Sequence, residues 1–172
     1  MEVWNLYTED RQVTQETHVR GIEIPDNRYH LVVHVWLQNP EGKYLLTQRA
    51  ANRKRLPLVW ECTCGSALLG ESSLQSAVRE VAEEVGLEID IQTDLGELMY
   101  SCVRKSFQGK KYNDILDVWV FETSKQPDLL SASTDEVAAT KWLTVPEIRT
   151  LWQSGEMNPE MEYFFSVICK EG

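Results

Sequence analysis

The segment at residues 72–86, SSLQSAVREVAEEVG, predicts an amphipathic helix and constrains the fold more than any other stretch of the chain. Its apolar residues recur at intervals of three and four, which places them on one stripe of a helix. They are Leu74, Ala77, Val78, Val81, Ala82 and Val85. Ser72 with Gln75 matches a capping box, and Gly86 suits the left-handed residue that follows many helices. We therefore expect a helix that begins after Ser72 and ends at Gly86.

Three glutamates of this segment, Glu80, Glu83 and Glu84, lie within about one third of the helix circumference. Clustered carboxylates raise one another's pKa unless a cation neutralises them. Their hard oxygen ligands suit Mg²⁺ or Mn²⁺, and Mg²⁺ is often completed by substrate phosphates. The residues therefore predict a divalent metal site that serves phosphate ester or anhydride chemistry. Arg79, four residues before Glu83, can orient a carboxylate from the side.

Strand-like runs precede and follow the predicted helix. Residues 29–39 and 44–50 indicate a hairpin around the turn PEGK, and alternate residues of its first strand predict that both sheet faces are covered. Further strands are expected at 58–65, 87–92, 95–105, 115–123 and 136–145, and further helices from Pro146 and over 158–170. This order predicts an α/β or α+β layered fold with one domain over residues 1–172.

Charge and apolar content exclude some classes of partner. The chain carries 17 Lys and Arg against 27 Asp and Glu, a formal net charge of −10, which disfavours duplex nucleic acid and anionic membrane. No run approaches about 18 uninterrupted apolar residues, and the N-terminal MEVWNLYTEDRQ lacks the pattern of a signal peptide. We expect a cytoplasmic protein whose four cysteines are mostly buried, reduced thiols.

Residues 65–87 read G, five residues, E, seven residues, then REVAEEVGL, which resembles the box of the Nudix hydrolases. The likeness extends over roughly residues 28–150 and leaves about 1–27 as an N-terminal extension. It implies an α/β/α sandwich with a mixed β-sheet. It also implies a Mg²⁺- or Mn²⁺-dependent pyrophosphohydrolase that cleaves a diphosphate linkage of a small molecule, with a nucleoside diphosphate derivative as the expected substrate.

The resemblance also implies roles for individual residues. Metal ligands would be Glu80, Glu83, Glu84 and the carbonyl of Gly65, and Glu71 with Arg79 would brace the loop and helix. A glutamate would be the general base for attack by water on phosphorus, and the catalytic residues are expected among Glu80, Glu83 and Glu136. Either Glu80 or the loop residue Glu136 would be that base. The basic cluster of Arg49, Arg53 and Lys54 is the candidate for binding the substrate phosphates.

The stretch HLVVHVWLQNPEGKYLLTQRAANRKRLPLVWECTCG also resembles isopentenyl-diphosphate isomerases, another branch of the same superfamily. Cys64 stands where those enzymes have a cysteine that transfers a proton at carbon, and His30 matches one of their metal-binding histidines. However, Ser66 and Glu23 replace two further histidines, and only Asp114 and Asp117 lie near the place of their paired glutamates. Because the hydrolase box is whole, hydrolysis is the favoured prediction.

Two alternatives to the hydrolase remain open: an isomerase that acts through Cys64, and a non-catalytic sensor that binds a nucleotide or metabolite. Three aromatic residues are available to stack on a nucleobase: Trp36, Tyr112 and Trp119. The apolar terminal segments MEVWNLY and MEYFFSVICK serve either as cover for the core or as the surface of a homodimer.

Overall fold

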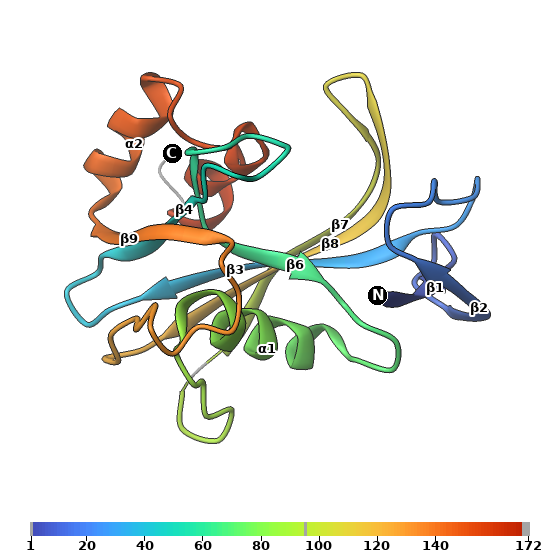
Figure 1. Ribbon diagram of the computed structural model, residues 1–172, viewed down its shortest axis with the longest axis horizontal. Helices are drawn as coiled ribbons and strands as arrows, with labels where there is room; N and C mark the ends of the chain where they lie inside the picture. The colour runs from blue at the N-terminus through green and yellow to red at the C-terminus, as the bar shows by residue number, and fades with distance from the viewer. Residues whose placement is uncertain (1, 95, 170–172) are drawn as a thin grey trace.

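A mixed β-sheet lies between two helical layers in the computed structural model, which describes residues 2–94 and 96–169 (Figure 1). The main sheet contains β3 (His30–Gln38), β4 (Tyr44–Arg49), β5 (Trp60–Glu61), β6 (Thr63–Ser66), β7 (Gly96–Phe107), β8 (Lys110–Glu122) and β9 (Val137–Leu143). The N-terminal strands β1 (Val3–Tyr7) and β2 (Val13–Val19) form a sheet of their own. The helical elements are α1 (Ser73–Val85), α2 (Val145–Gln153), the 3₁₀ turn η1 (Pro159–Met161) and the π-helix η2 (Phe164–Ile168).

Strand β3 is the centre of the main sheet. It pairs in parallel with β8 along its whole length and antiparallel with β6 over Val32–Val35, which makes the sheet mixed. The predicted hairpin of β3 and β4 is present, but the two strands share only the pair Gln38 and Tyr44. Strand β4 then diverges to pair with β9 and β5. The sheet therefore splits between β6, which pairs with β3, and β5, which pairs with β4. Residues 67–72, the box loop, lead from β6 into α1.

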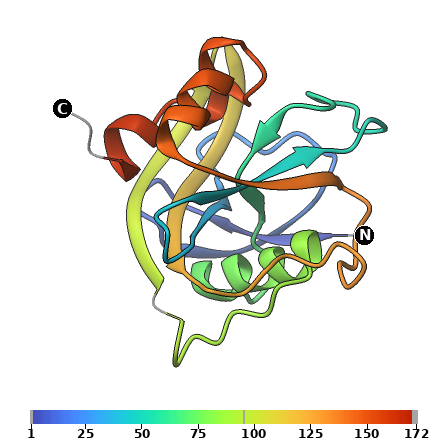
Figure 2. The same ribbon diagram turned by 90° about the vertical axis from the view of Figure 1, so that its left-hand side faces the viewer.

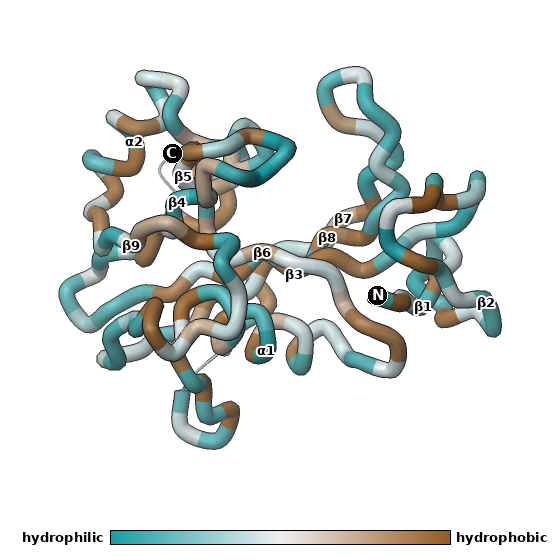
Figure 3. The backbone as a smooth tube through the Cα atoms, viewed as in Figure 1, coloured by the Kyte–Doolittle hydropathy of each residue, from teal (hydrophilic) through white to brown (hydrophobic). Residues whose placement is uncertain are grey.

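Apolar side chains cover both faces of β3, as its alternating pattern predicts. Figure 2 shows α1 on one side of the sheet and the C-terminal helical elements on the other. Val33, Val35 and Leu37 pack on the apolar stripe of α1, whereas Trp36 packs under α2 and the C-terminal segment. In Figure 3, brown apolar stretches follow the central strands and teal hydrophilic ones predominate in the outlying loops. Trp36 is fully buried, so the prediction that it is available to a nucleobase is wrong.

The predicted capping of α1 is confirmed. Ser72 accepts a hydrogen bond from the backbone N–H of Gln75, and the Gln75 side chain accepts one from the backbone of Ser72 at 2.8 Å. Gly86 adopts φ of 63° and donates its N–H to the Ala82 carbonyl. These contacts satisfy backbone groups that a helix leaves unpaired at its ends.

Three predicted elements differ from the structure. Residues 87–92 form no strand. The alternate apolar residues Leu87 and Ile89 are buried beside α1, but the segment pairs with no other strand. The strand expected at 58–65 is interrupted at Cys62, since its halves pair with different strands. The closing helix expected over 158–170 is a 3₁₀ turn followed by a π-helix, and residue 170 lies outside the described residues.

None of the helices in the described part of the chain combines the length and apolar character that spanning a membrane requires. All four cysteines are free thiols, but the expectation that most of them are buried is wrong: Cys62 is buried, and Cys64, Cys102 and Cys169 are partly buried.

We predict that Gly86→Ala destabilises the fold more than Gly109→Ala does. Both glycines have positive φ, which costs alanine about 1–2 kcal/mol. A Cβ at Gly86 would also overlap the backbone of Asp128, whereas the space around Gly109 is open. Urea denaturation of both variants measures the difference in the free energy of unfolding, and equal losses would contradict the steric contribution of Asp128.

Candidate active site and metal centre

Glu80, Glu83 and Glu84 of α1 line one cavity of about 190 Å³ together with Gly65 of β6. The remaining lining residues are Glu2, Arg20, Cys64, Ser66, Leu68, Arg79, Thr134 and Glu136. The structure thus brings the four predicted metal-binding residues and the loop candidate Glu136 to one place. Helix α1 presents its carboxylates to the point where the main sheet divides.

Gly65 lets α1 approach the sheet closely. A Cβ at this position would overlap the carboxylate of Glu80, whose side chain is mostly buried against the β6 backbone. Any side chain at residue 65 would therefore displace Glu80. The glycine of the box is needed for this close approach, since its φ is not in the left-handed region.

Arg79 and Glu71, the predicted bracing pair, are in direct contact. The Nε and Nη2 atoms of Arg79 donate to the two Glu71 oxygens at 2.7 and 2.9 Å, and Nη2 also donates to the Ser66 carbonyl at 2.9 Å. Glu71 further accepts the Leu68 N–H and the Ser76 hydroxyl. Burial alone would raise the pKa of Glu71, but these donors outweigh it and lower that pKa. The arrangement ties the box loop to the helix.

The same Arg79 guanidinium reaches the candidate metal ligands. Its Nη1 donates to Glu80 Oε1 at 2.8 Å and to Glu83 Oε2 at 2.9 Å. Within the described residues, no three His, Cys, Asp or Glu side chains are already arranged as a metal centre. Because Nη1 lies against two of the three carboxylates, a metal ion would have to take over those oxygens from Arg79.

Glu136 is positioned by the loop between β8 and β9. This loop is fastened to the end of α1, because the N–H of Asp128 donates to the Val85 carbonyl at 2.8 Å and the N–H of Ser133 donates to the Glu83 carbonyl at 3.0 Å. Glu136 also forms an ion pair with Arg53 at 2.6 Å. The loop therefore adds a carboxylate to the cavity that α1 also lines.

The electrostatics of the cavity are unfavourable without a cation. Burial raises the pKa of Glu80 to about 7, with Arg79 acting against this shift. Burial, reinforced by Glu80, Glu61 and Glu136, raises the pKa of Glu84 well above its ordinary value. A divalent ion would favour the charged forms of these groups, and oxygen donors suit Mg²⁺ or Mn²⁺. The donor set therefore fits such an ion.

The three basic residues predicted to bind substrate have different surroundings. Arg53 pairs with Glu136 at the cavity, and Lys54 is exposed on the same loop. Arg49 donates to the buried Glu61 at 2.6 Å and to the Arg55 carbonyl at 3.1 Å. These contacts favour a structural role for Arg49, because binding a phosphate would leave Glu61 buried without its charged partner.

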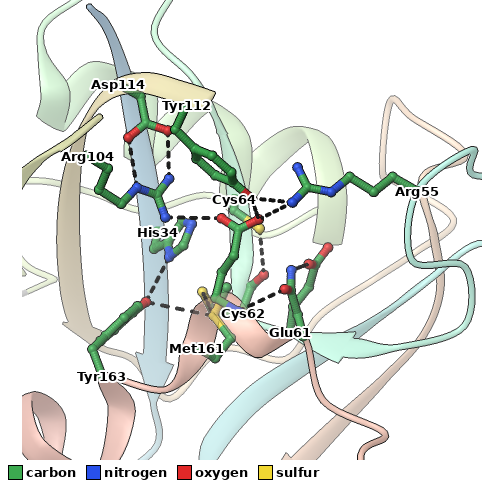
Figure 4. A network of polar contacts seen from close by, with 12 residues as sticks. His34, Arg55, Glu61, Cys62, Cys64, Arg104, Tyr112, Asp114, Met161 and Tyr163 are labelled. Carbon is green, nitrogen blue, oxygen red and sulfur yellow. Dashed lines mark hydrogen bonds and ion pairs between the residues drawn. The ribbon is translucent and has the colours of Figure 1, made fainter. Parts of the chain in front are cut away.

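A second polar network lies next to Cys64, on the face of the sheet opposite α1 (Figure 4). Arg104 forms a two-pronged ion pair with Asp114 and a further one with Glu160, which also accepts from Tyr112 at 2.6 Å. Glu160 and Tyr112 also contact Arg55. The network joins η1 to the β7–β8 hairpin and to the loop after β4. Its charged groups are all paired with one another, so the network holds the C-terminal segment against the sheet.

Of the residues of the isomerase alternative, His30 and Asp114 are register partners on β3 and β8, but each is also engaged by another side chain. Cys64 Sγ donates to the Cys62 carbonyl at 3.3 Å, and its contact with Cys62 and its burial raise the thiol pKa well above the ordinary value. His30 stacks on Trp4 at 4.3 Å, away from the carboxylate cavity. Asp114 is paired with Arg104 and Asp117 with Arg11, and Glu23 pairs with Lys111 at the surface.

Two cavity residues, Glu2 and Arg20, were not anticipated from the sequence. They belong to the N-terminal segment, which carries no motif, and they meet the box only through the tertiary fold. Of the remaining aromatic candidates, Trp119 packs against the α1 core and donates to Ser73, while Tyr112 belongs to the second polar network. Neither lines the carboxylate cavity.

Comparison with known proteins places this geometry in a family. The family model of the NUDIX domain matches residues 28–166. A Nudix hydrolase of Listeria innocua, lin0387, is 35% identical over 166 residues, which are 96% of this chain and 91% of the relative. An isopentenyl-diphosphate Delta-isomerase of Escherichia coli is 30% identical over 125 residues, 72% of this chain and 66% of the relative.

Solved structures show the same fold. DR0079 of Deinococcus radiodurans aligns with a TM-score of 0.70 at 20% identity and covers 91% of each chain. The NUDIX domain of Shewanella oneidensis NrtR, solved with ADP ribose, aligns with a TM-score of 0.57 at 18% identity over 71% of this chain and 77% of that one. At these identities the likeness concerns the fold.

We predict that His34→Gln weakens the dependence of stability on pH. His34 is buried beside the Tyr163 hydroxyl, and burial lowers its pKa to about 3, against about 6.5 for an unfolded histidine. The unfolded state thus binds more protons between these values. Above about pH 6.5 the neutral His34 contributes fully to the free energy of unfolding. As the pH falls below that value, this contribution decreases by up to about 1.4 kcal/mol per pH unit.

Urea denaturation of wild type and His34→Gln from pH 7.5 to pH 5 measures this contribution. The free energy of unfolding of the wild type should fall relative to that of the variant over this range. Parallel profiles would show that His34 is equally protonated in the folded and unfolded states.

Proposed function

The chain belongs to the Nudix hydrolase family, and on that premise we propose that it cleaves a diphosphate linkage of a small molecule with Mg²⁺ or Mn²⁺ as cofactor. One observation supports this above all: Glu80, Glu83 and Glu84 line a single cavity together with Gly65 and Glu136. A bound divalent ion would neutralise the diphosphate charge and acidify the attacking water. Glu80, Glu83, Glu84 and the Gly65 carbonyl are the proposed ligands.

In the proposed reaction, water attacks one phosphorus of the diphosphate and the bridging P–O bond breaks. One water is consumed, and two phosphate-bearing products leave. A carboxylate takes the proton of the water, and Glu80 and Glu136 are the two candidates for this base. Glu136 lies on a loop and is partly exposed beside Arg53, whereas Glu80 is held by Arg79 and Gly65. Arg79 keeps the helix carboxylates oriented toward the reacting group.

The dimensions of the cavity bear on the substrate. A volume of about 190 Å³ is below the roughly 300–1,000 Å³ of pockets that enclose whole ligands, so it suits the diphosphate part alone. The remainder of the substrate would extend out of the cavity. We propose a nucleoside diphosphate derivative, since a protein of the same fold was solved with ADP ribose.

Cys64 is the reason to retain isomerisation of an isoprenoid diphosphate as a second candidate. Cys64 lines the carboxylate cavity, and the E. coli isomerase is 30% identical to this chain over 125 residues. Proton transfer at carbon would require a reactive group, but the contacts and burial of this thiol oppose its ionisation. His30 and Asp114 are neighbours on β3 and β8, but Asp114 is paired with Arg104 and Asp117 with Arg11, which disfavours this candidate further.

We predict that Glu83→Gln lowers kcat by about 100-fold or more with the fold intact, because it removes a charged metal ligand. Cys64→Ala should retain hydrolysis. Glu88→Gln is the matched control, since Glu88 is exposed just beyond α1 and does not line the cavity. EDTA should abolish the activity, and added Mg²⁺ or Mn²⁺ should restore it.

The measurement is phosphate release, after a coupling phosphatase, from nucleoside diphosphates, nucleotide sugars, ADP-ribose, dinucleoside polyphosphates and isopentenyl diphosphate. Equal activity of Glu83→Gln and Glu88→Gln would contradict the assigned site. Conversion of isopentenyl diphosphate without phosphate release, lost in Cys64→Ala, would establish the isomerase. Tight binding of a nucleotide without any turnover would establish a sensor.

A further inference from the structure

The N-terminal hairpin of β1 and β2 forms part of the wall of the carboxylate cavity. Glu2, just before β1, and Arg20, just after β2, both line it, although they precede residues 28–166 that match the NUDIX domain. Figure 1 shows this hairpin beside the loop that leads from β6 into α1. The cavity is therefore completed by a segment outside the family domain.

Backbone contacts hold the hairpin against the box loop. The N–H of Leu69 donates to the Val3 carbonyl at 2.8 Å, and the N–H of Arg20 donates to the Glu2 carbonyl at 3.1 Å. The ring of Trp4 stacks on His30 of β3. These contacts fix the ends of the hairpin next to the cavity, so the position of Arg20 follows from the fold.

An ion pair between a partly exposed arginine and a buried aspartate secures the other end of the hairpin. Arg11, in the turn between β1 and β2, donates to both oxygens of Asp117 at 2.7 and 2.8 Å. The Asp117 side chain is fully buried in β8 and also accepts from Ser101. Breaking such a pair would leave a buried charge without a partner, which is costly. The hairpin is thus docked at both ends.

Arg20 differs from the other cation of the cavity. Among the described residues that line it, the positively charged side chains are Arg20 and Arg79. Arg79 is committed to Glu71, Glu80, Glu83 and the Ser66 carbonyl. Arg20 has a single side-chain partner, Glu2 at 2.5 Å, and both side chains are about half exposed. Exposed ion pairs of this kind contribute little to stability, so an incoming phosphate can replace Glu2 as the partner of Arg20.

We propose that Arg20 is a substrate-binding residue that holds a phosphate of the diphosphate group from the N-terminal hairpin. The inference rests on the proposed function and names a residue of the hairpin for it. A guanidinium donates two parallel hydrogen bonds to phosphate oxygens, which gives both affinity and orientation. In a cavity rich in carboxylates, Arg20 supplies the attraction for an anion that the glutamates repel.

Arg20→Ala should raise KM for the diphosphate substrate by about 10- to 100-fold, because it removes a charge-assisted contact. It should change kcat by less than about threefold. Arg20→Lys should lie between, because it keeps the charge and loses the paired donors. Arg28→Ala is the matched control: Arg28 pairs with Glu16 of β2 and does not line the cavity. Thermal denaturation checks that each variant is folded.

A binding measurement separates this inference from the proposed function. Titration calorimetry with α,β-methylene ADP and with inorganic pyrophosphate, in Mg²⁺ and in EDTA, needs no turnover. Binding that weakens in Arg20→Ala and persists in Arg28→Ala supports the role of Arg20 even if no substrate is hydrolysed. Equal KM and affinity in the two variants would overturn it. Absence of both turnover and binding in the wild type would overturn both proposals.

Discussion

The network around Arg79 is the interaction on which the site depends. One guanidinium contacts Glu71, Glu80, Glu83 and the Ser66 carbonyl, and so links the box loop, the helix α1 and strand β6. Without this charge, the clustered glutamates would repel one another against a buried sheet edge, where repulsion is weakly screened. The network keeps the carboxylates in place until a divalent ion shares the task of neutralising them.

The sheet gives this network its position. Strand β3 carries β6 on one side and β8 on the other, and the divergence of β4 opens the edge where Gly65 faces Glu80. The two faces of the sheet have different roles. The α1 face carries the acidic cavity, and the other face carries a paired network of Arg55, Arg104 and Glu160 that clamps the C-terminal segment. Cys64 stands between the two, in a setting that opposes a reactive thiolate.

Local patterns made much of the fold and site predictable. The helix at 73–85 and its caps follow from periodicity and from residues that bond near neighbours in the chain, and three carboxylates on one helix face remain together in any tertiary structure. The segment 87–92 shows the limit of such patterns. Alternating burial of Leu87 and Ile89 resembles a strand, but a strand needs a partner that only the assembled sheet supplies.

The sequence by itself determined the family, the acidic helix face and the kind of metal that suits it, because these depend on residue identity and helix geometry. Tertiary structure decided which charges meet. It paired Arg49 with Glu61 and Arg53 with Glu136, and it buried Trp36. It also brought Glu2 and Arg20 to a cavity whose other lining residues are distant from them in the sequence. Such contacts arise from the pairing and docking of distant strands, which no local spacing encodes.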